Sequence, residues 1–296
     1  MICIRRACRA LIAIALPVSM VVPAAAGAPF GAADLAAEEA KFAAWSVRHG
    51  MRDAFVEFFA DDSILLRPDP VNGRDYMRAQ ANPPIVLDWR SSLAVLSASG
   101  DLGMSTGPWV STSKADPAAP AGHGQFFSVW QRQSTGQWKV LIDHGISHDK
   151  PATEAKLAAY DLTGGHAATA PAGDAEAGFA ARTVAASAAV AYAEASTDRT
   201  RLLRNGRQPI NGTAAIATYL QSVPGSWRWQ PVKQGASKAG DFAYALGTYT
   251  WQATDGAKQQ GHYIRVWVRD AGVDSKRWKL AAEVLTPRPP APAPKA

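Results

Sequence analysis

Residues 138–143 read Trp138-Lys139-Val140-Leu141-Ile142-Asp143, and the same pattern returns as Trp278-Lys279 with Glu283 five residues after the tryptophan. Ahead of each copy, further sets of anchor residues recur in the same order, and the spacing within each set is equal. They are Gly100-Asp101-Leu102 with Gly107 against Gly240-Asp241-Phe242 with Gly247, Gly124 with Trp130 against Gly261 with Trp267, and Val71-Asn72-Gly73 against Ile210-Asn211-Gly212. Because chance does not produce an ordered set of this kind, we predict an internal duplication.

Within each copy, the residue pattern changes from helical to strand-like. Apolar residues at helical spacing predict helices over 34–49 and 52–59, with Asp34 as the N-cap, and the alanine-rich stretch 177–195 predicts one helix. Beyond an Asn-Gly turn, alternating segments predict strands at 91–97, 104–111, 125–133, 138–146, 241–253, 262–269 and 277–285. Helices followed by antiparallel strands give an α+β fold, with a strongly curved sheet over the helices.

Composition divides the chain into five parts. Three arginines precede an apolar run at 10–22 that ends in small residues, which is typical of a signal peptide at 1–26. The domains are predicted at 27–148 and 175–286, and the Ala-, Gly- and Pro-rich stretch 149–174 is predicted to link them, with a short helix around 152–162. Residues 287–296 are proline-rich and predicted to be a solvated tail. We therefore expect an exported protein, periplasmic or secreted.

Charge and cysteine content exclude several classes of function. The chain of 296 residues has a net charge of +6, but three of the positive charges lie in the predicted signal peptide and two in the tail. The nearly neutral remainder does not fit a nucleic-acid partner. Both cysteines, Cys3 and Cys8, fall in the signal peptide, so the mature chain offers no thiol, disulfide or lipid-anchor cysteine. We expect no membrane anchor, no metal and no cofactor.

The repeated motifs resemble those of the nuclear transport factor 2-like superfamily, in particular its SnoaL-like branch, which includes many exported bacterial domains. The motifs that carry the resemblance are Gly100-Asp101-Leu102-Gly103, Val129-Trp130 and residues 138–143, with Gly240-Asp241-Phe242-Ala243, Val266-Trp267 and Trp278-Lys279-Leu280 in the second copy. The resemblance implies two cone-shaped domains, each with an apolar pocket. Enzymes of the superfamily, which include ketosteroid isomerase, cyclases and dehydratases, use a buried carboxylic acid to move a proton, whereas other members only bind ligands.

Asp143 is the candidate acid. It lies in an otherwise apolar strand, and Glu283 has the same place in the second copy. The alternative is a carboxylate that faces solvent or pairs with a basic residue on a neighbouring strand. Strand alternation groups Asp143 with Lys139 and Leu141, and it leaves open which face lines the pocket. Since the first copy carries the richer polar set, we expect the first domain to be the functional one.

Aromatic and basic residues complete the candidate pocket of the first domain. The candidate ligand-pocket residues are Trp89, Trp109, Trp130, His144 and Arg67. The competing interpretation makes the tryptophans core residues, which we favour for the repeated Trp130, and makes Arg67 part of a rigid turn beside Pro68. A metal bound by His123, His144 and His148 is disfavoured, because no acidic or cysteine cluster accompanies these histidines.

Three functions fit these residues. The leading one is binding of a small apolar or aromatic molecule in the first domain. The second is an isomerase, cyclase or dehydratase activity with Asp143 as acid and base. The third is a structural or interaction role, with both pockets filled by their own side chains. In all three the two domains pair through their sheets as an intrachain pseudo-dimer, which gives a monomeric protein.

Overall fold

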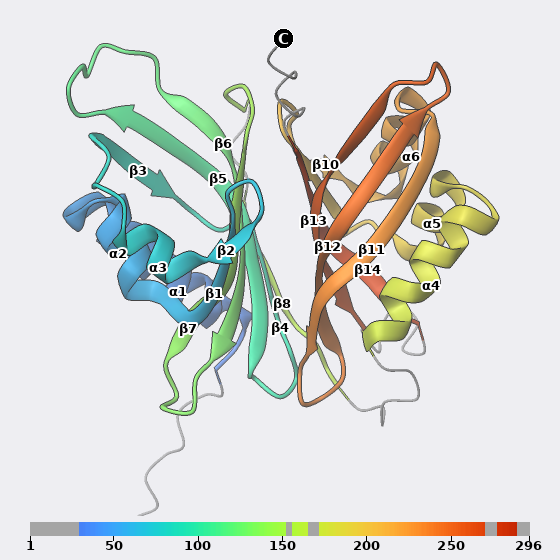
Figure 1. The fold of residues 1–296 in the computed structure, drawn as a ribbon. Helices are drawn as coiled ribbons and strands as arrows, with labels where there is room; N and C mark the ends of the chain where they lie inside the picture. Colours follow the sequence, from blue (N-terminus) through green and yellow to red (C-terminus); the bar gives the residue numbers. More distant parts are fainter. Residues whose placement is uncertain (1–29, 152–155, 165–171, 270–276, 289–296) are drawn as a thin grey trace, which may run out of the picture.

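The structure is a computed structural model that describes residues 30–151, 156–164, 172–269 and 277–288. The predicted signal peptide and residues 289–296 of the predicted tail lie outside these ranges. Two domains stand side by side, each with its sheet toward the middle of the molecule and its helices on the outer side (Figure 1). Among the described residues, no helix combines the length and the apolar character that crossing a bilayer requires.

The first domain opens with two helices whose apolar stripe is buried, and a mixed sheet follows. Its elements are α1 (Ala32–His49), α2 (Met51–Phe58), β1 (Phe59–Leu66), β2 (Pro70–Asn72), α3 (Gly73–Arg78), β3 (Ile85–Trp89), β4 (Leu93–Leu96), β5 (Leu102–Ser113), β6 (Gly122–Arg132), β7 (Trp138–Ser147) and β8 (Ala158–Asp161). The strand order is β2-β1-β7-β6-β5-β4-β8, and β3 pairs with a separate part of β5. The core between helices and sheet is aromatic, with Phe42 in contact with Phe55, Phe58 and Trp89.

The second domain repeats this scheme with fewer strands. Its elements are α4 (Ala172–Ala185), α5 (Ala188–Ala195), β9 (Arg201–Arg204), β10 (Ile210–Asn211), α6 (Gly212–Ser222), β11 (Gly225–Ala236), β12 (Phe242–Ala253), β13 (Lys258–Val268) and β14 (Lys279–Pro287). The strand order β10-β9-β14-β13-β12-β11 matches β2-β1-β7-β6-β5 and its neighbours in the first domain. The predicted α+β fold with helices on a curved sheet is therefore confirmed in both halves of the chain.

Several local predictions differ from the structure. The sheets are not purely antiparallel, because β1 with β7, β9 with β14 and β4 with β8 pair in parallel. The predicted helix 177–195 is two helices, and the side chain of Ser187 caps the second by accepting from Val190 N. The Asn-Gly turn at Asn72 is the start of α3, where Asn72 Oδ1 accepts a hydrogen bond from Asp75 N at 2.9 Å.

The segment between the domains is partly a strand. Residues 158–161 form β8 at the edge of the first sheet, where the short helix around 152–162 was predicted. Asp161, the last residue of β8, contacts the start of α1, where its Oδ1 accepts a hydrogen bond from Ala32 N at 2.7 Å. At the other end, Pro287 still belongs to β14, and Arg288 forms an ion pair with Asp69 of the first domain.

The two sheets pack on each other and share one continuous apolar core. Its members include Val95, Met104, Phe127, Val129 and Ile142 from the first sheet and Leu203, Phe242, Leu246, Ile264 and Val266 from the second. All of these side chains are buried. The predicted pairing of the domains through their sheets is thus present within one chain, as the facing ribbons in Figure 1 show.

The repeated Gly-Asp anchors add polar contacts to this interface. Asp101 Oδ2 accepts a hydrogen bond from Lys238 N at 3.1 Å, and Asp241 Oδ2 accepts one from Ala98 N at 2.9 Å. Each aspartate therefore caps the corresponding turn of the other domain. This reciprocity is what an approximate two-fold relation between two copies of one unit produces.

Candidate functional site

A β-bulge in β7 turns Asp143 toward the interior of the first domain. Trp130 pairs with Val140 and Val129 pairs with Ile142, so Leu141 is an extra residue in the ladder. The bulge shifts the alternation by one residue. The prediction that grouped Asp143 with Lys139 and Leu141 is therefore wrong, because Leu141 packs in the core between the sheets. The same bulge at Ala281 orients Glu283 in the second domain.

Asp143 lines a cavity of about 240 Å³ between the helices and the sheet of the first domain. The wall is largely apolar and comes from α2, β3, β5 and β6. Its apolar members are Met51, Phe55, Ile85, Leu87, Trp89, Trp109 and Phe126. Arg67, Ser111, His144 and Gly145 complete the lining, so that Asp143 is the one carboxylate among the described residues that line this cavity.

Glu39 is a second buried acid in this domain, and sequence analysis did not single it out. It lies on α1 with 1% of its surface exposed. Trp89 Nε1 donates to Glu39 Oε1 at 2.6 Å, Trp130 Nε1 donates to Oε2 at 2.8 Å, and Ser105 also donates to Oε2. The sequence does contain a signal for its burial, because Glu39 lies four residues after Leu35 and three before Phe42, on the apolar stripe of the helix.

Burial raises the pKa of both acids, and the charge of Glu39 adds to the shift of Asp143. Burial raises the pKa of Asp143 to about 7, the charge of Glu39 adds to this, and a hydrogen bond from Ser128 and the charge of Arg67 oppose it. Ser128 Oγ donates to Asp143 Oδ2 at 3.0 Å. Burial also raises the pKa of Glu39, against the hydrogen bonds from Ser105 and the two indoles. Two neighbouring carboxyls in an apolar site do not both ionise readily, so Asp143 changes charge near neutral pH.

The second domain carries the same acids, but there they are neutralised. Arg265, whose side chain is fully buried, occupies the position of Ser128 and forms ion pairs with both Glu176 and Glu283. Arg204 also pairs with Glu283, and Tyr192 donates a hydrogen bond to it at 2.7 Å. Burial by itself raises the pKa of Glu283, but the charges of Arg265 and Arg204 outweigh burial and the net shift is downward. This carboxylate stays ionised and is held in place.

The remaining candidate residues fall into different environments. Trp89 and Trp109 line the cavity, whereas Trp130 is fully buried beneath it and does not line it. Arg67 lines the cavity and donates from Nη1 to its neighbour Leu66 O at 2.8 Å. His144 contributes to the lining, but its Nε2 lies 2.8 Å from Thr286 Oγ1 of the second domain. Burial lowers the pKa of His144 to about 4, so this ring is neutral at physiological pH.

His123 and His148 lie elsewhere, on the wall of a separate cleft between the domains. They are therefore not combined with His144 in one site. Within the described ranges, no group of three or more histidine, cysteine, aspartate or glutamate side chains is arranged to hold a metal ion.

Comparison with known proteins gives structural neighbours only. No protein-family model matches the chain, and no curated protein sequence matches it. A ketosteroid isomerase-like protein from Erwinia carotovora atroseptica is 17% identical, with a TM-score of 0.32 over 40% of this chain and 94% of its own. An NTF-2-like protein of unknown function from Shewanella oneidensis is 14% identical, with a TM-score of 0.30 over 37% and 90%. A Δ5-3-ketosteroid isomerase from Mycobacterium sp. is 11% identical, with a TM-score of 0.31 over 38% and 89%.

The assignment of the fold in each domain rests on the elements and the strand order described above.

Proposed function

We propose that the first domain binds a small, largely apolar or aromatic molecule whose one polar group lies against Asp143. The observation that carries this proposal is the contrast between the domains. Asp143 lines an open cavity and has no ion-pair partner among the described residues, whereas Glu283 is neutralised by Arg265 and Arg204. A carboxyl group that is protonated below about neutral pH can donate a hydrogen bond to a carbonyl oxygen, and when ionised it can accept one from a hydroxyl group.

The size of the cavity limits the ligand. An apolar protein cavity of about 150 Å³ accommodates benzene. A volume of about 240 Å³ therefore fits a molecule of one or two rings. The presence of this open space favours binding over an interaction role with filled pockets.

The second domain acts as a scaffold in this proposal. A cavity of about 220 Å³ opens there too, lined by Arg204, Tyr219 and Trp251 among others. Glu283 does not belong to that lining, because the Arg265 network buries it. The second domain therefore presents no titratable carboxyl group to a ligand at that position.

Matched cavity-filling variants test the assignment. Ile85→Trp fills the first cavity and Val223→Trp fills the second, and both positions are half-buried. Native mass spectrometry of the mature protein should detect a co-purified small molecule that is released on denaturation. We expect it in the wild type and in Val223→Trp but not in Ile85→Trp. Retention by Ile85→Trp, or loss only in Val223→Trp, would contradict the proposal.

The second candidate function is proton transfer by Asp143, in an isomerase, cyclase or dehydratase. The raised pKa of about 7 favours it, because an acid–base group works best when its pKa is near the working pH. Arg67, on the same cavity wall, would stabilise negative charge that develops on the substrate. In a screen of one- and two-ring carbonyl compounds, Asp143→Asn should abolish turnover and keep ligand binding. Turnover by Asp143→Asn would rule out this role.

We also propose that the protein is exported, from the arginines and the apolar run in residues 1–26. Expression in a Gram-negative host should give a periplasmic protein whose N-terminal sequence starts at Gly27. An intact N-terminus on cytoplasmic protein would contradict this.

A further inference from the structure

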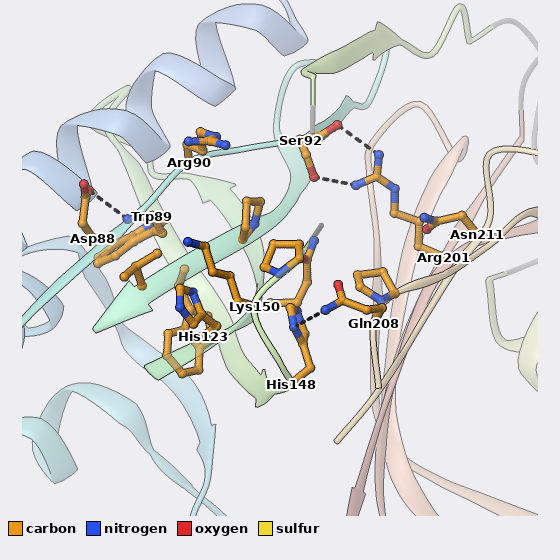
Figure 2. Close-up of a pocket in the computed structure, with 16 residues that line it drawn as sticks. Asp88, Trp89, Arg90, Ser92, His123, His148, Lys150, Arg201, Gln208 and Asn211 are labelled. Carbon is orange, nitrogen blue, oxygen red and sulfur yellow. Dashed lines mark hydrogen bonds between the residues drawn. The ribbon is translucent and has the colours of Figure 1, made fainter. Parts of the chain in front are cut away.

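A second and larger cleft, of about 670 Å³, lies between the two domains. It forms where the strand arrangement of the first sheet differs from that of the second. In the second domain β11 pairs with β12 along its whole length, but in the first domain the equivalent edge is split into β3 and β4. The residues at the split, Arg90 and Ser92, line the cleft, and Arg201 at the start of β9 faces them from the second domain (Figure 2).

The cleft carries an excess of positive charge. Arg90, Lys150 and Arg201 line it, and Asp88 is the one carboxylate among the described residues that line it. The Asp88 Oδ1 atom already accepts a hydrogen bond from Trp89 N at 2.8 Å. In Figure 2 the three basic side chains lie around the same space. An anion that entered this space would meet basic side chains from both domains.

Arg201 is the strongest indication of a ligand. Its guanidinium group crosses the domain boundary and donates to Ser92 Oγ at 2.7 Å and to Ser92 O at 3.0 Å. Both acceptors are neutral, and among the described residues no carboxylate pairs with it. Burial lowers the pKa of Arg201, so the charged form is held at a cost. A partly buried cation without a counter-charge gains most from a bound anion.

His148 has an unsatisfied polar atom at the cleft. Its side chain is 8% exposed. Its Nδ1 lies 2.7 Å from Asp149 O, and Gln208 of the second domain donates to the same carbonyl at 2.6 Å. Gln208 Nε2 also lies 3.1 Å from His148 Nδ1, and Nε2 of His148 has no hydrogen-bond partner among the described residues. Buried polar atoms are normally satisfied, so this one is an additional contact for a ligand.

The rest of the cleft wall suits a flat apolar group. The indole of Trp109 lies against Gly124, where a Cβ atom would come within 2.4 Å of the ring. Trp109 Nε1 donates to Ile146 O at 3.1 Å, which fixes the orientation of the ring. Pro108, Pro151 and Pro209 extend this apolar surface. Trp109 also lines the first-domain cavity, so the two spaces share a wall but have different polar groups.

We propose that the cleft between the domains is a second binding site, which takes a small organic anion: a carboxylate or phosphate group held by Arg201, Lys150 and Arg90, on an aromatic body that packs against Trp109. The cleft requires both domains, since Arg201 comes from one and Trp109 from the other. It is independent of the proposed function of Asp143, which does not line it.

Isothermal titration of the mature protein with three matched probes tests this site. The probes are phenylacetate, phenyl phosphate and the neutral phenylacetamide. We expect one or both anions to bind at least about tenfold more tightly than the amide, and the better anion identifies the headgroup. Inorganic phosphate alone should bind more weakly than phenyl phosphate, because it lacks the ring. Equal affinity for the amide, or for inorganic phosphate, would overturn the proposal.

Variants locate the binding. Arg201→Gln and Lys150→Gln should each weaken anion binding about tenfold or more, because a hydrogen bond or ion pair to a charged group is lost. Arg78→Gln removes the same charge from the exposed surface of α3 and should leave the affinity unchanged. Arg201→Lys keeps the positive charge and should retain part of the anion binding. This variant tests the role of the charge even if Arg201→Gln perturbs the fold. Asp143→Asn should bind the anion as the wild type does. Equal weakening by Arg78→Gln, or loss in Asp143→Asn alone, would contradict a site in this cleft.

Discussion

Asp143 on β7 and Glu283 on β14 occupy the same position in their domains, and within the described part of the chain Glu283 is ion-paired whereas Asp143 is not. One difference is the residue on the neighbouring strand, which is Ser128 in the first domain and Arg265 in the second, and Arg204 adds a further cation beside Glu283. A serine supplies one hydrogen bond and no charge. The same duplicated scaffold therefore holds one carboxyl group that titrates near neutrality and one that stays ionised. This contrast is the basis for placing function in the first domain.

The raised pKa of Asp143 predicts a specific pH dependence of stability. The native group holds its proton up to about pH 7, whereas in the unfolded chain it releases the proton near the ordinary value of 3.8. Between these values the native state binds more protons, so rising pH favours unfolding. The stabilisation is complete below the unfolded pKa and is lost as pH rises through the native one. Its size is on the order of 4 kcal/mol at most.

The measurement compares urea unfolding of the wild type and Asp143→Asn from pH 4 to pH 8. The free energy of unfolding of the wild type minus that of the variant should fall as pH rises. His144 has the opposite effect, because burial lowers its pKa to about 4, but it is present in both proteins and cancels in the difference. Parallel curves for the two proteins would show that Asp143 does not titrate in this range.

Removing the buried cation of the second domain should be costly. Arg265→Met leaves Glu176 without its ion-pair partner and Glu283 with Arg204 alone. Breaking a buried ion pair from one side costs about 3–5 kcal/mol, since an uncompensated charge remains. Arg228→Met on the exposed side of β11 is the matched control and should change the free energy of unfolding by less than about 0.5 kcal/mol. Adding Glu176→Gln to Arg265→Met should recover part of the loss. Similar effects at Arg265 and Arg228 would contradict this account.

Much of the fold could be predicted from the sequence, because the repeated anchors fix the order of elements in both domains. Asp143 was chosen as the candidate acid because a carboxylate is unusual in an otherwise apolar strand. Its direction was not predictable, because one extra residue at Leu141 reverses the alternation, and a bulge leaves no signal in residue types. Glu39 was not predicted, although it lies on the apolar stripe of α1, because the indoles that bind it come from strands far along the chain. The cleft between the domains depends on how the two sheets dock, which no local pattern records.

Two substitutions at Ser128 should move the pKa of Asp143 in opposite directions. Ser128→Ala removes the hydrogen bond to Asp143 Oδ2, which stabilises the ionised form, so the pKa should rise above its present value of about 7. Ser128→Arg copies the second domain and places a cation beside Glu39 and Asp143, so the pKa should fall and ligand binding in the cavity should be lost. Carboxyl carbon NMR titration follows both shifts. If Ser128→Arg does not fold, the result for Ser128→Ala decides, and an unchanged pKa would contradict the assignment.

Separating the domains should expose the apolar faces of their sheets. A fragment covering residues 27–164 keeps β8, whereas one ending at residue 148 lacks it and its parallel pairing with β4. We expect the longer fragment to self-associate when alone and to form a one-to-one complex with residues 172–296, since each sheet buries its apolar face against the other. The fragment ending at residue 148 should unfold at lower urea concentration than the longer one.

The hydrogen bond that Asp101 accepts across the interface gives a second test of the association between the domains. Asp101→Ala in the longer fragment removes the acceptor for Lys238 N and should weaken the complex by up to about tenfold, because the amide is left without its partner. Asp116→Ala, on a surface loop, is the matched carboxylate deletion and should leave the affinity unchanged. Analytical ultracentrifugation measures both association states and affinities. Fragments that are each soluble, stable and monomeric, and that do not associate when mixed, would show that the sheets do not need each other and that the two domains are joined only by the chain.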